Sequence, residues 1–108
     1  MTRFIVTNQQ DHQPTEHKEA LASGLKEIAK QMFEHAPADS GVAWNVVPKG
    51  FGFTAGELSS STVVLCAMPD NTEYSKRVEF MERINELWVQ TTGIDANKLA
   101  IFTTSALL

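Results

Sequence analysis

The stretch TVVLCAMPDNTEYSKRVEFMERINELWVQTTGIDANKLAIFTT, residues 62–104, decides the fold. It opens at 62–68 with an apolar, β-branched run, which is typical of a strand buried on both faces. Apolar residues then recur at helical spacing around Ile84, and Gly93 suits the left-handed conformation that ends many helices. Residues 99–104 resemble a second strand. The stretch therefore predicts a strand, a helix and a strand, in that order.

Residues 3–47 repeat this order. A β-branched and aromatic run predicts a strand at 3–8, an apolar stripe predicts a helix starting near 14–15, and alternation at 42–47 predicts another strand. Right-handed crossovers make the strands of each unit parallel. We therefore expect an α+β fold in which two consecutive β-α-β units form a four-stranded mixed sheet with two helices on one face. The glycine- and serine-rich segment 49–61 predicts a loop or an irregular hairpin between the units.

The composition narrows the function classes. The chain has 108 residues and a net charge of −4, which suits a single domain, 1–108, and argues against a nucleic-acid partner. The sequence contains neither a polybasic patch nor a long apolar segment, so we expect no membrane partner. A single cysteine, Cys66, excludes an internal disulfide and predicts a buried thiol in a cytoplasmic protein. The sequence contains no phosphate-binding loop, dinucleotide fingerprint or zinc motif, so we expect no cofactor and no metal.

Several segments together resemble the tautomerase superfamily. Phe4-Ile5-Val6 and Asn45-Val46-Val47-Pro48 are similar to its migration inhibitory factor members. The loop at 50–56, the strand at 62–68 and the tail at 92–102 resemble the branch of cis-3-chloroacrylic acid dehalogenase and malonate semialdehyde decarboxylase. The resemblance covers nearly the whole chain and lies in the pattern of several segments, not in one unique motif. It implies a homotrimer of double β-α-β units, with the sheets facing an inner barrel and an N-terminal proline acting as base or acid.

The chain departs from that family at the residues that carry its chemistry. Thr2 occupies the position of the proline, and with Met1 in place its nitrogen is an amide that cannot act as a base. The branch holds a substrate carboxylate with arginines in the turn that here reads Met-Pro-Asp-Asn, 68–71, where Asp70 would repel such a group. Ala29 stands where the dehalogenase resemblance implies a histidine. The resemblance thus implies weak, atypical or lost keto-enol isomerase activity on small carboxylated substrates.

Four residues are candidates for binding such a substrate, while the catalytic residue stays unknown. Lys76 and Arg77, early in the second helix, could form an anion-binding pair, although a solvated helix face is the simpler interpretation. Arg3 follows the chain start and could reach the pocket in which this pair would bind an anion. It could also be a charge at the sheet edge or at a subunit interface. Asn45 could line a pocket or form a hydrogen bond at an interface.

Three function classes remain open on the sequence alone. The first is a divergent tautomerase-like protein that binds a small carboxylate. The second is a non-enzymatic trimeric binding or scaffold protein with the same fold. The third is a ferredoxin-like dimeric α+β barrel, because the order of strands and helices along the chain is the same. The mass in solution separates a dimer from a trimer.

Overall fold

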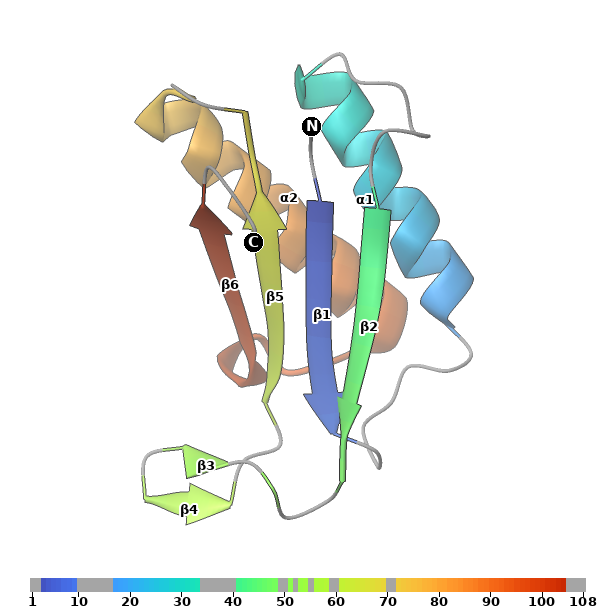
Figure 1. The fold of residues 1–108 in the computed structure, drawn as a ribbon, viewed down its shortest axis with the longest axis vertical. Coiled ribbons are helices and arrows are strands. Elements are labelled where there is room, and N and C mark those ends of the chain that lie inside the picture. Colours follow the sequence, from blue (N-terminus) through green and yellow to red (C-terminus); the bar gives the residue numbers. More distant parts are fainter. Residues whose placement is uncertain are drawn as a thin grey trace.

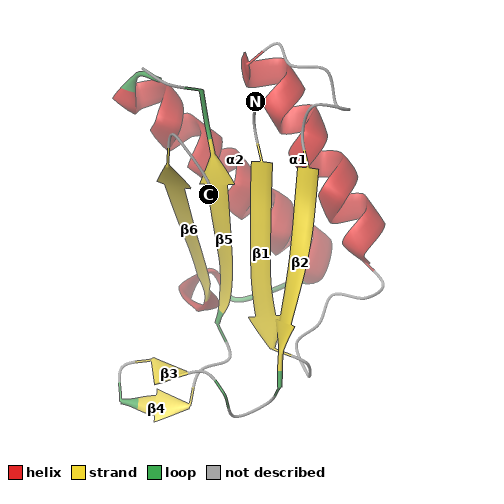
Figure 2. Cartoon of the chain, in the orientation of Figure 1, coloured by secondary structure: helices red, strands yellow, loops and turns green. Residues whose placement is uncertain are grey.

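The structure, a computed structural model, describes residues 3–9, 17–33, 41–48, 51, 53–54, 56–58, 61–69 and 72–104 (Figure 2). Its elements are β1 (Arg3–Gln9), α1 (Lys18–Phe33), β2 (Gly41–Val47), β3 (Phe53–Thr54), β4 (Glu57–Leu58), β5 (Thr62–Ala67), α2 (Tyr74–Thr92), a 3-10 helix (Ala96–Lys98) and β6 (Leu99–Thr104). None of the described helices is long and apolar enough to cross a membrane.

The main sheet has the strand order β2-β1-β5-β6. β1 and β2 are parallel, β5 and β6 are parallel, and β1 and β5 are antiparallel. Both helices lie on one side of the sheet (Figure 1). The expected α+β architecture is therefore confirmed. The two strands of each unit are direct neighbours, so the sheet differs from the ferredoxin-like split β-α-β arrangement, in which another strand separates them.

The core fills the space between the sheet and the two helices. Alternate residues of β1 and β5 point toward the helices, and every fourth or third residue of each helix points back. Phe80 joins the two units, because its ring centroid lies 5.1 Å from that of Phe33, edge-on, and 6.1 Å from that of Phe4. The largest fully buried side chains include Trp88, Phe4, Phe80, Leu21, Leu25, Met68, Ile84, Val6 and Val64.

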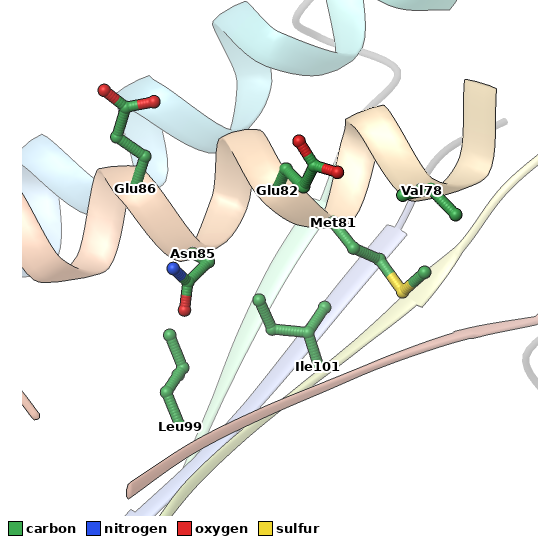
Figure 3. A pocket seen from close by; sticks show the side chains of 7 residues that line it. All are labelled: Val78, Met81, Glu82, Asn85, Glu86, Leu99 and Ile101. Atoms are coloured by element: carbon green, nitrogen blue, oxygen red, sulfur yellow. The ribbon is translucent and has the colours of Figure 1, made fainter. Parts of the chain in front are cut away.

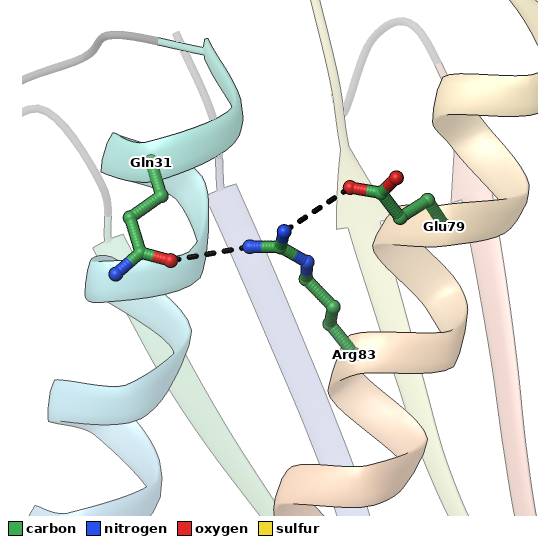
Figure 4. Close-up of polar contacts among 3 residues, drawn as sticks. All are labelled: Gln31, Glu79 and Arg83. Atoms are coloured by element: carbon green, nitrogen blue, oxygen red, sulfur yellow. Dashed lines mark hydrogen bonds and ion pairs between the residues drawn. The ribbon is translucent and has the colours of Figure 1, made fainter.

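The two helices approach each other closely at Gly24. A Cβ atom placed there would lie 2.6 Å from Leu87 Cδ1, well inside van der Waals contact, so only glycine fits without movement of Leu87. Near the other end of α1, Arg83 links the helices at the surface (Figure 4). Its guanidinium lies 3.2 Å from the Glu79 carboxylate and donates a 3.1 Å hydrogen bond to the Gln31 side-chain oxygen.

The end of α2 tests a sequence prediction. The predicted end at Gly93 is confirmed, because this residue has φ of 73° and its N–H donates to the carbonyl of Val89 at 2.9 Å. At its start, the N-cap residue of α2 is Glu73, whose side chain makes no capping hydrogen bond. Thr72 lies in the preceding turn, where its hydroxyl donates to the carbonyl of Pro69 at 2.6 Å. The predicted start signals of α1 at residues 14–15 lie outside the described residues.

The segment between the two units forms the hairpin that the glycine- and serine-rich sequence allowed. β3 and β4 pair as a two-stranded antiparallel sheet, with Phe53 opposite Leu58 and Thr54 opposite Glu57. Gly56 has φ of 81°, which is the left-handed conformation that a tight turn requires and glycine adopts at no steric cost.

The face of the main sheet away from the helices, called the open face below, is mostly apolar. The pairing register places Ala43, Ile5, Leu65 and Phe102 in one row across β2, β1, β5 and β6. Phe102 is 57% exposed, and Ile5 and Leu65 are half-buried. The prediction that 62–68 is buried on both faces is therefore wrong for a single chain, because the helices cover one side only.

Candidate functional site

One end of the main sheet gathers the segments that the family resemblance points to. β1 and β2 begin there, and β5 ends there, because β1 runs parallel to β2 and antiparallel to β5. The residues in register at this end are Arg3, Gly41 and Ala67. The chain then turns and α2 begins at the same end (Figure 1). We call this region the Arg3 end; Thr2, the position of the family's proline, lies outside the described residues.

Arg3 is exposed and lines a small hollow at this end. The hollow has a volume of about 170 Å³ and is formed by the first residues of the two parallel strands: Arg3, Phe4, Ile5, Gly41, Val42 and Ala43. Arg3 contributes the guanidinium, and the absence of a side chain at Gly41 opens the space beside it. The hollow is too small for a drug-sized ligand, for which ~300–1,000 Å³ is usual, but it has room for a small carboxylate.

Arg77 occupies an unusual position for a charged residue. It lies three residues before Phe80 and seven before Ile84, so it continues the buried stripe of α2 toward the Arg3 end. Its side chain is half-buried, and its Nε–H is buried with no acceptor in the described part of the chain. Phe80, which packs near Phe4, lies about one helical turn after Arg77 along α2.

Lys76 points elsewhere. It is exposed, and its Nζ lies 4.9 Å from the centroid of the Phe33 ring, close enough for a cation–π interaction. It lines a different hollow of about 390 Å³ between the helices, together with Arg83 and Glu79. The structure therefore brings Arg3, Lys76 and Arg77 to the same end of the molecule, but neither Lys76 nor Arg77 lines the hollow of Arg3. The solvated-face interpretation fits Lys76 and not Arg77.

The start of α2 adds positive potential to this end. The first turn, Tyr74 to Arg77, contains no acidic residue, and among the described residues no side chain caps its free N–H groups. These N–H groups carry about half a positive charge in sum. Lys76 and Arg77 add two positive charges to the same turn, next to the carboxylate of the N-cap residue Glu73.

Of two other positions from the sequence analysis, one lies away from this end and the other is enclosed in the core. Asn45 is exposed on the open face, in register with Thr7, and about 13 Å along β2 from Gly41 at the usual rise per residue. Ala29, where the resemblance implied a histidine, is fully buried in the core against the sheet. Asn45 is therefore better placed for a contact across the open face than for a shared site with Arg3.

The cysteine, histidine and acidic side chains that the structure describes form no metal-binding or reactive cluster. Cys66 is fully buried, as predicted, and burial raises the pKa of its thiol to about 12, which keeps it protonated and unreactive. No group of three metal-ligating side chains occurs among the described residues. His17 is half-buried at the start of α1. His12, His35 and the side chain of Glu57 lie outside what the structure describes.

Sequence reasoning missed the inward position of Arg77 and a groove between α2 and β6. A signal for the first was present, because Arg77 falls on the apolar stripe of α2 at the same spacing as Phe80 and Ile84. The groove has no such signal, because it depends on how far α2 lies from the outermost strand.

Two adjacent parallel β-α-β units, joined antiparallel and covered on one face by both helices, define the tautomerase-superfamily fold, and this chain has that fold. The crystal structure of native Ps01740 superimposes with a TM-score of 0.91 at 15% identity, over 96% of this chain and 93% of that one. N1, a member of the cis-3-chloroacrylic acid dehalogenase family, gives 0.86 at 13% identity, over 94% of this chain and 73% of that one.

A third similar structure is Q0, described as a fused 4-OT wild-type symmetric trimer, with a TM-score of 0.83 at 16% identity over 96% of this chain and 85% of that one. No protein-family model matches the sequence, and no curated protein matches it significantly. The high TM-scores show a shared fold, but identities this low do not carry an activity over to this chain. Its activity is inferred from its own residues.

Proposed function

We propose that this protein is a tautomerase-like protein that binds small carboxylates at the Arg3 end and has weak, atypical or lost keto-enol isomerase activity. One observation carries the proposal: the buried Nε–H of Arg77 lacks an acceptor within the described structure. A buried donor without a partner costs about 1–3 kcal/mol, and a hydrogen bond to a charged group is worth about 1.5–3 kcal/mol. A carboxylate that accepts from Arg77 removes that cost.

The cationic surroundings favour an anion over a neutral ligand. Arg3 lines the hollow at the start of β1, and the uncapped first turn of α2 directs N–H groups toward the same end. The hollow's small volume and its walls of Phe4, Ile5 and Val42 favour a compact acid with an apolar carbon skeleton. These features support a substrate class and do not select one acid within it.

Weak activity follows from the groups that are missing. A threonine hydroxyl at position 2 cannot replace the ring amine of a proline as a base near neutral pH. Loss of a general base typically lowers the rate by about 10²–10⁴-fold. The residue at the position of the implied histidine, Ala29, is buried and apolar, so α1 supplies no replacement there.

We further propose that the chain forms a homotrimer through the open face. The row Ala43, Ile5, Leu65 and Phe102 presents apolar side chains that one chain leaves partly exposed. A small domain gains stability when such a face is covered by another subunit. The similar structure Q0 is a trimer, which supports the same assembly for this chain. Sedimentation that yields a stable monomer or dimer would remove this part of the proposal.

Binding is tested with phenylpyruvate as the probe. We expect Arg77→Gln to weaken the binding of phenylpyruvate by about tenfold, because it removes a charge-assisted hydrogen bond worth about 1.5–3 kcal/mol. Arg83→Gln is the matched control, since Arg83 lies on the same helix, is exposed and already pairs with Glu79. Equal effects of the two substitutions would show that only net charge matters and would refute a site at Arg77.

A non-enzymatic binding or scaffold protein is the second candidate, favoured by the replacement of the proline by Thr2. The two candidates differ in the response to Thr2→Pro with the initiator methionine removed. A pocket that retains the geometry of a tautomerase gains ketonisation of phenylenolpyruvate above background. No gain in the protein with a verified N-terminal proline supports the binding role.

A further inference from the structure

A groove runs between α2 and the outermost strand, β6 (Figure 3). It has a volume of about 510 Å³, the largest of the hollows described above. Its floor and walls are Leu99 and Ile101 from β6 and Val78 and Met81 from α2, with Asn85 and the carboxylates of Glu82 and Glu86 along the helix side. In Figure 3 Met81 and Asn85 point toward the strand, whereas Glu82 and Glu86 stand on the side away from it.

The groove exists because α2 covers the sheet unevenly. The buried stripe of the helix, Phe80, Ile84 and Trp88, packs in the main core. Leu99 and Ile101 are the helix-facing residues of β6, which is the edge of the main sheet, and both remain half-buried. Apolar side chains on two elements therefore stay accessible at an edge where a further chain segment can lie.

The acidic rim has no internal explanation. Glu82 and Glu86 lie in the middle and second half of α2, beyond the first turn in which a negative charge would stabilise the helix through its dipole. Within the described residues no Lys or Arg forms an ion pair with either carboxylate, and Glu86 accepts only a 2.8 Å hydrogen bond from Gln90. Lys98 is exposed next to Leu99 but does not line the groove.

The dimensions fit a short extended segment. From Val78 to Asn85 the helix rises by about 10 Å at ~1.5 Å per residue, a length that about three extended residues span. We propose that this groove docks a segment of a partner protein in which an apolar side chain is flanked by Lys or Arg. The apolar side chain contacts Met81 and Ile101, and the cationic groups pair with Glu82 and Glu86. This role does not depend on carboxylate binding at the Arg3 end.

The test uses a fluorescein-labelled peptide, acetyl-Arg-Leu-Arg-Leu-Arg-amide, and the full-length protein at about 0.15 M salt. We expect the double variant E82Q/E86Q to weaken peptide binding by about two- to thirtyfold, since it removes two surface ion pairs. The control is E19Q/E27Q on α1, where both residues are exposed and Glu27 accepts from Gln31 as Glu86 does from Gln90. Both doubles change the net charge equally, and we expect less than a twofold effect from the control.

A second variant tests the apolar part of the groove. Met81→Ser should weaken the same peptide severalfold, while a peptide with Gly in place of Leu should bind weakly and respond little to Met81→Ser. Thermal denaturation monitored by circular dichroism establishes that each variant is folded. Equal losses in E82Q/E86Q and E19Q/E27Q would reduce the effect to general charge attraction and refute the proposal. A change in the oligomeric mass of E82Q/E86Q would assign the groove to a subunit contact and also refute it.

Discussion

The two β-α-β units use their helices differently. Both helices bury an apolar stripe against the same sheet, but their charges are arranged in opposite ways. α1 has Glu19 in its first turn and Lys30 in its last turn, the arrangement that stabilises a helix through its dipole. α2 has no acidic residue in its first turn and no basic residue in its last turn, and instead has Lys76 and Arg77 in its first turn. The charges in the terminal turns of α1 therefore stabilise their helix, whereas those in the first turn of α2 do not.

The charges of α2 link the proposed anion site at the Arg3 end to the proposed peptide-binding groove. The cations at the start of α2 add to the positive end of its own dipole and favour an anion at the Arg3 end. The carboxylates of Glu82 and Glu86 favour a cation at the groove. Lys76 and Arg77, in the first turn, cost the isolated helix about 0.3–1 kcal/mol per charge, and the anion binding that we propose would offset this cost.

The largest expected effect tests whether the two helices contribute equally to the core. Phe80→Ala should lower the free energy of unfolding by about 3–5 kcal/mol, because Phe80 is fully buried and packs against Phe4 and Phe33. Leu25→Ala in α1 should cost about 2–5 kcal/mol. Urea denaturation measures both. A loss below about 1 kcal/mol at Phe80 alone would mean that α2 is not anchored as α1 is.

The next effect concerns the contact between the units. Gly24→Leu should cost about 1–3 kcal/mol by overpacking, because even a Cβ atom at this position lies 2.6 Å from Leu87 Cδ1. Gly24→Ala should be nearly neutral, since the gain of about 1 kcal/mol in helix propensity offsets a shift of the flexible Leu87 side chain. Adding Leu87→Ala should recover part of the loss in Gly24→Leu. Additive effects in that double-mutant cycle would place the helices farther apart than described.

The titration of Cys66 tests how completely the helices cover β5 in the second unit. Burial raises the pKa of its thiol to about 12, whereas in the unfolded chain the thiol ionises near pH 8.5–9. The folded state therefore holds a proton that the unfolded state releases, and stability falls as pH rises above about 9. At pH 10.5 the loss attributable to this thiol should be about 2 kcal/mol.

Cys66→Ala provides the comparison for that pH dependence. The variant lacks the thiol but retains every other titrating group, so the difference between the two unfolding curves isolates the contribution of Cys66. Denaturation at pH 7.5 and 10.5 measures it. Parallel pH dependences of the two proteins, or rapid labelling of native Cys66 by a thiol reagent at pH 8, would contradict a fully covered strand.

The sequence predicted the elements better than the site because the two depend on different ranges of interaction. Local patterns such as the β-branched run at 62–68 and the glycine at 93 have local structural consequences, and the structure agrees with them. The direction in which Arg77 points and the separation of Lys76 from Arg3 depend on how α2 lies over the sheet. The half-burial of Leu65 depends on the covering of the open face, which no pattern within one strand reports.

The smallest effect addresses the contrast between the helices most directly. Ser75 is an exposed residue in the first turn of α2, and Ser75→Glu supplies the acidic residue that this turn lacks. The new charge should stabilise the helix dipole by about 0.3–1 kcal/mol. Glu19→Gln in α1 removes the corresponding charge and should destabilise the protein by a similar amount. Urea denaturation at low salt measures both changes, and both should shrink at about 1 M salt.

The same Ser75→Glu variant should bind phenylpyruvate more weakly than the unsubstituted protein, because a carboxylate beside Lys76 and Arg77 repels the probe and offers Arg77 an internal acceptor. Glu19→Gln, far from the Arg3 end, should leave phenylpyruvate binding unchanged. Stability and binding would then move in opposite directions at α2, which is the behaviour expected where stabilising charges have been given up for a ligand. A Ser75→Glu protein that is both more stable and equally tight for phenylpyruvate would show that the bare first turn of α2 has no role in anion binding.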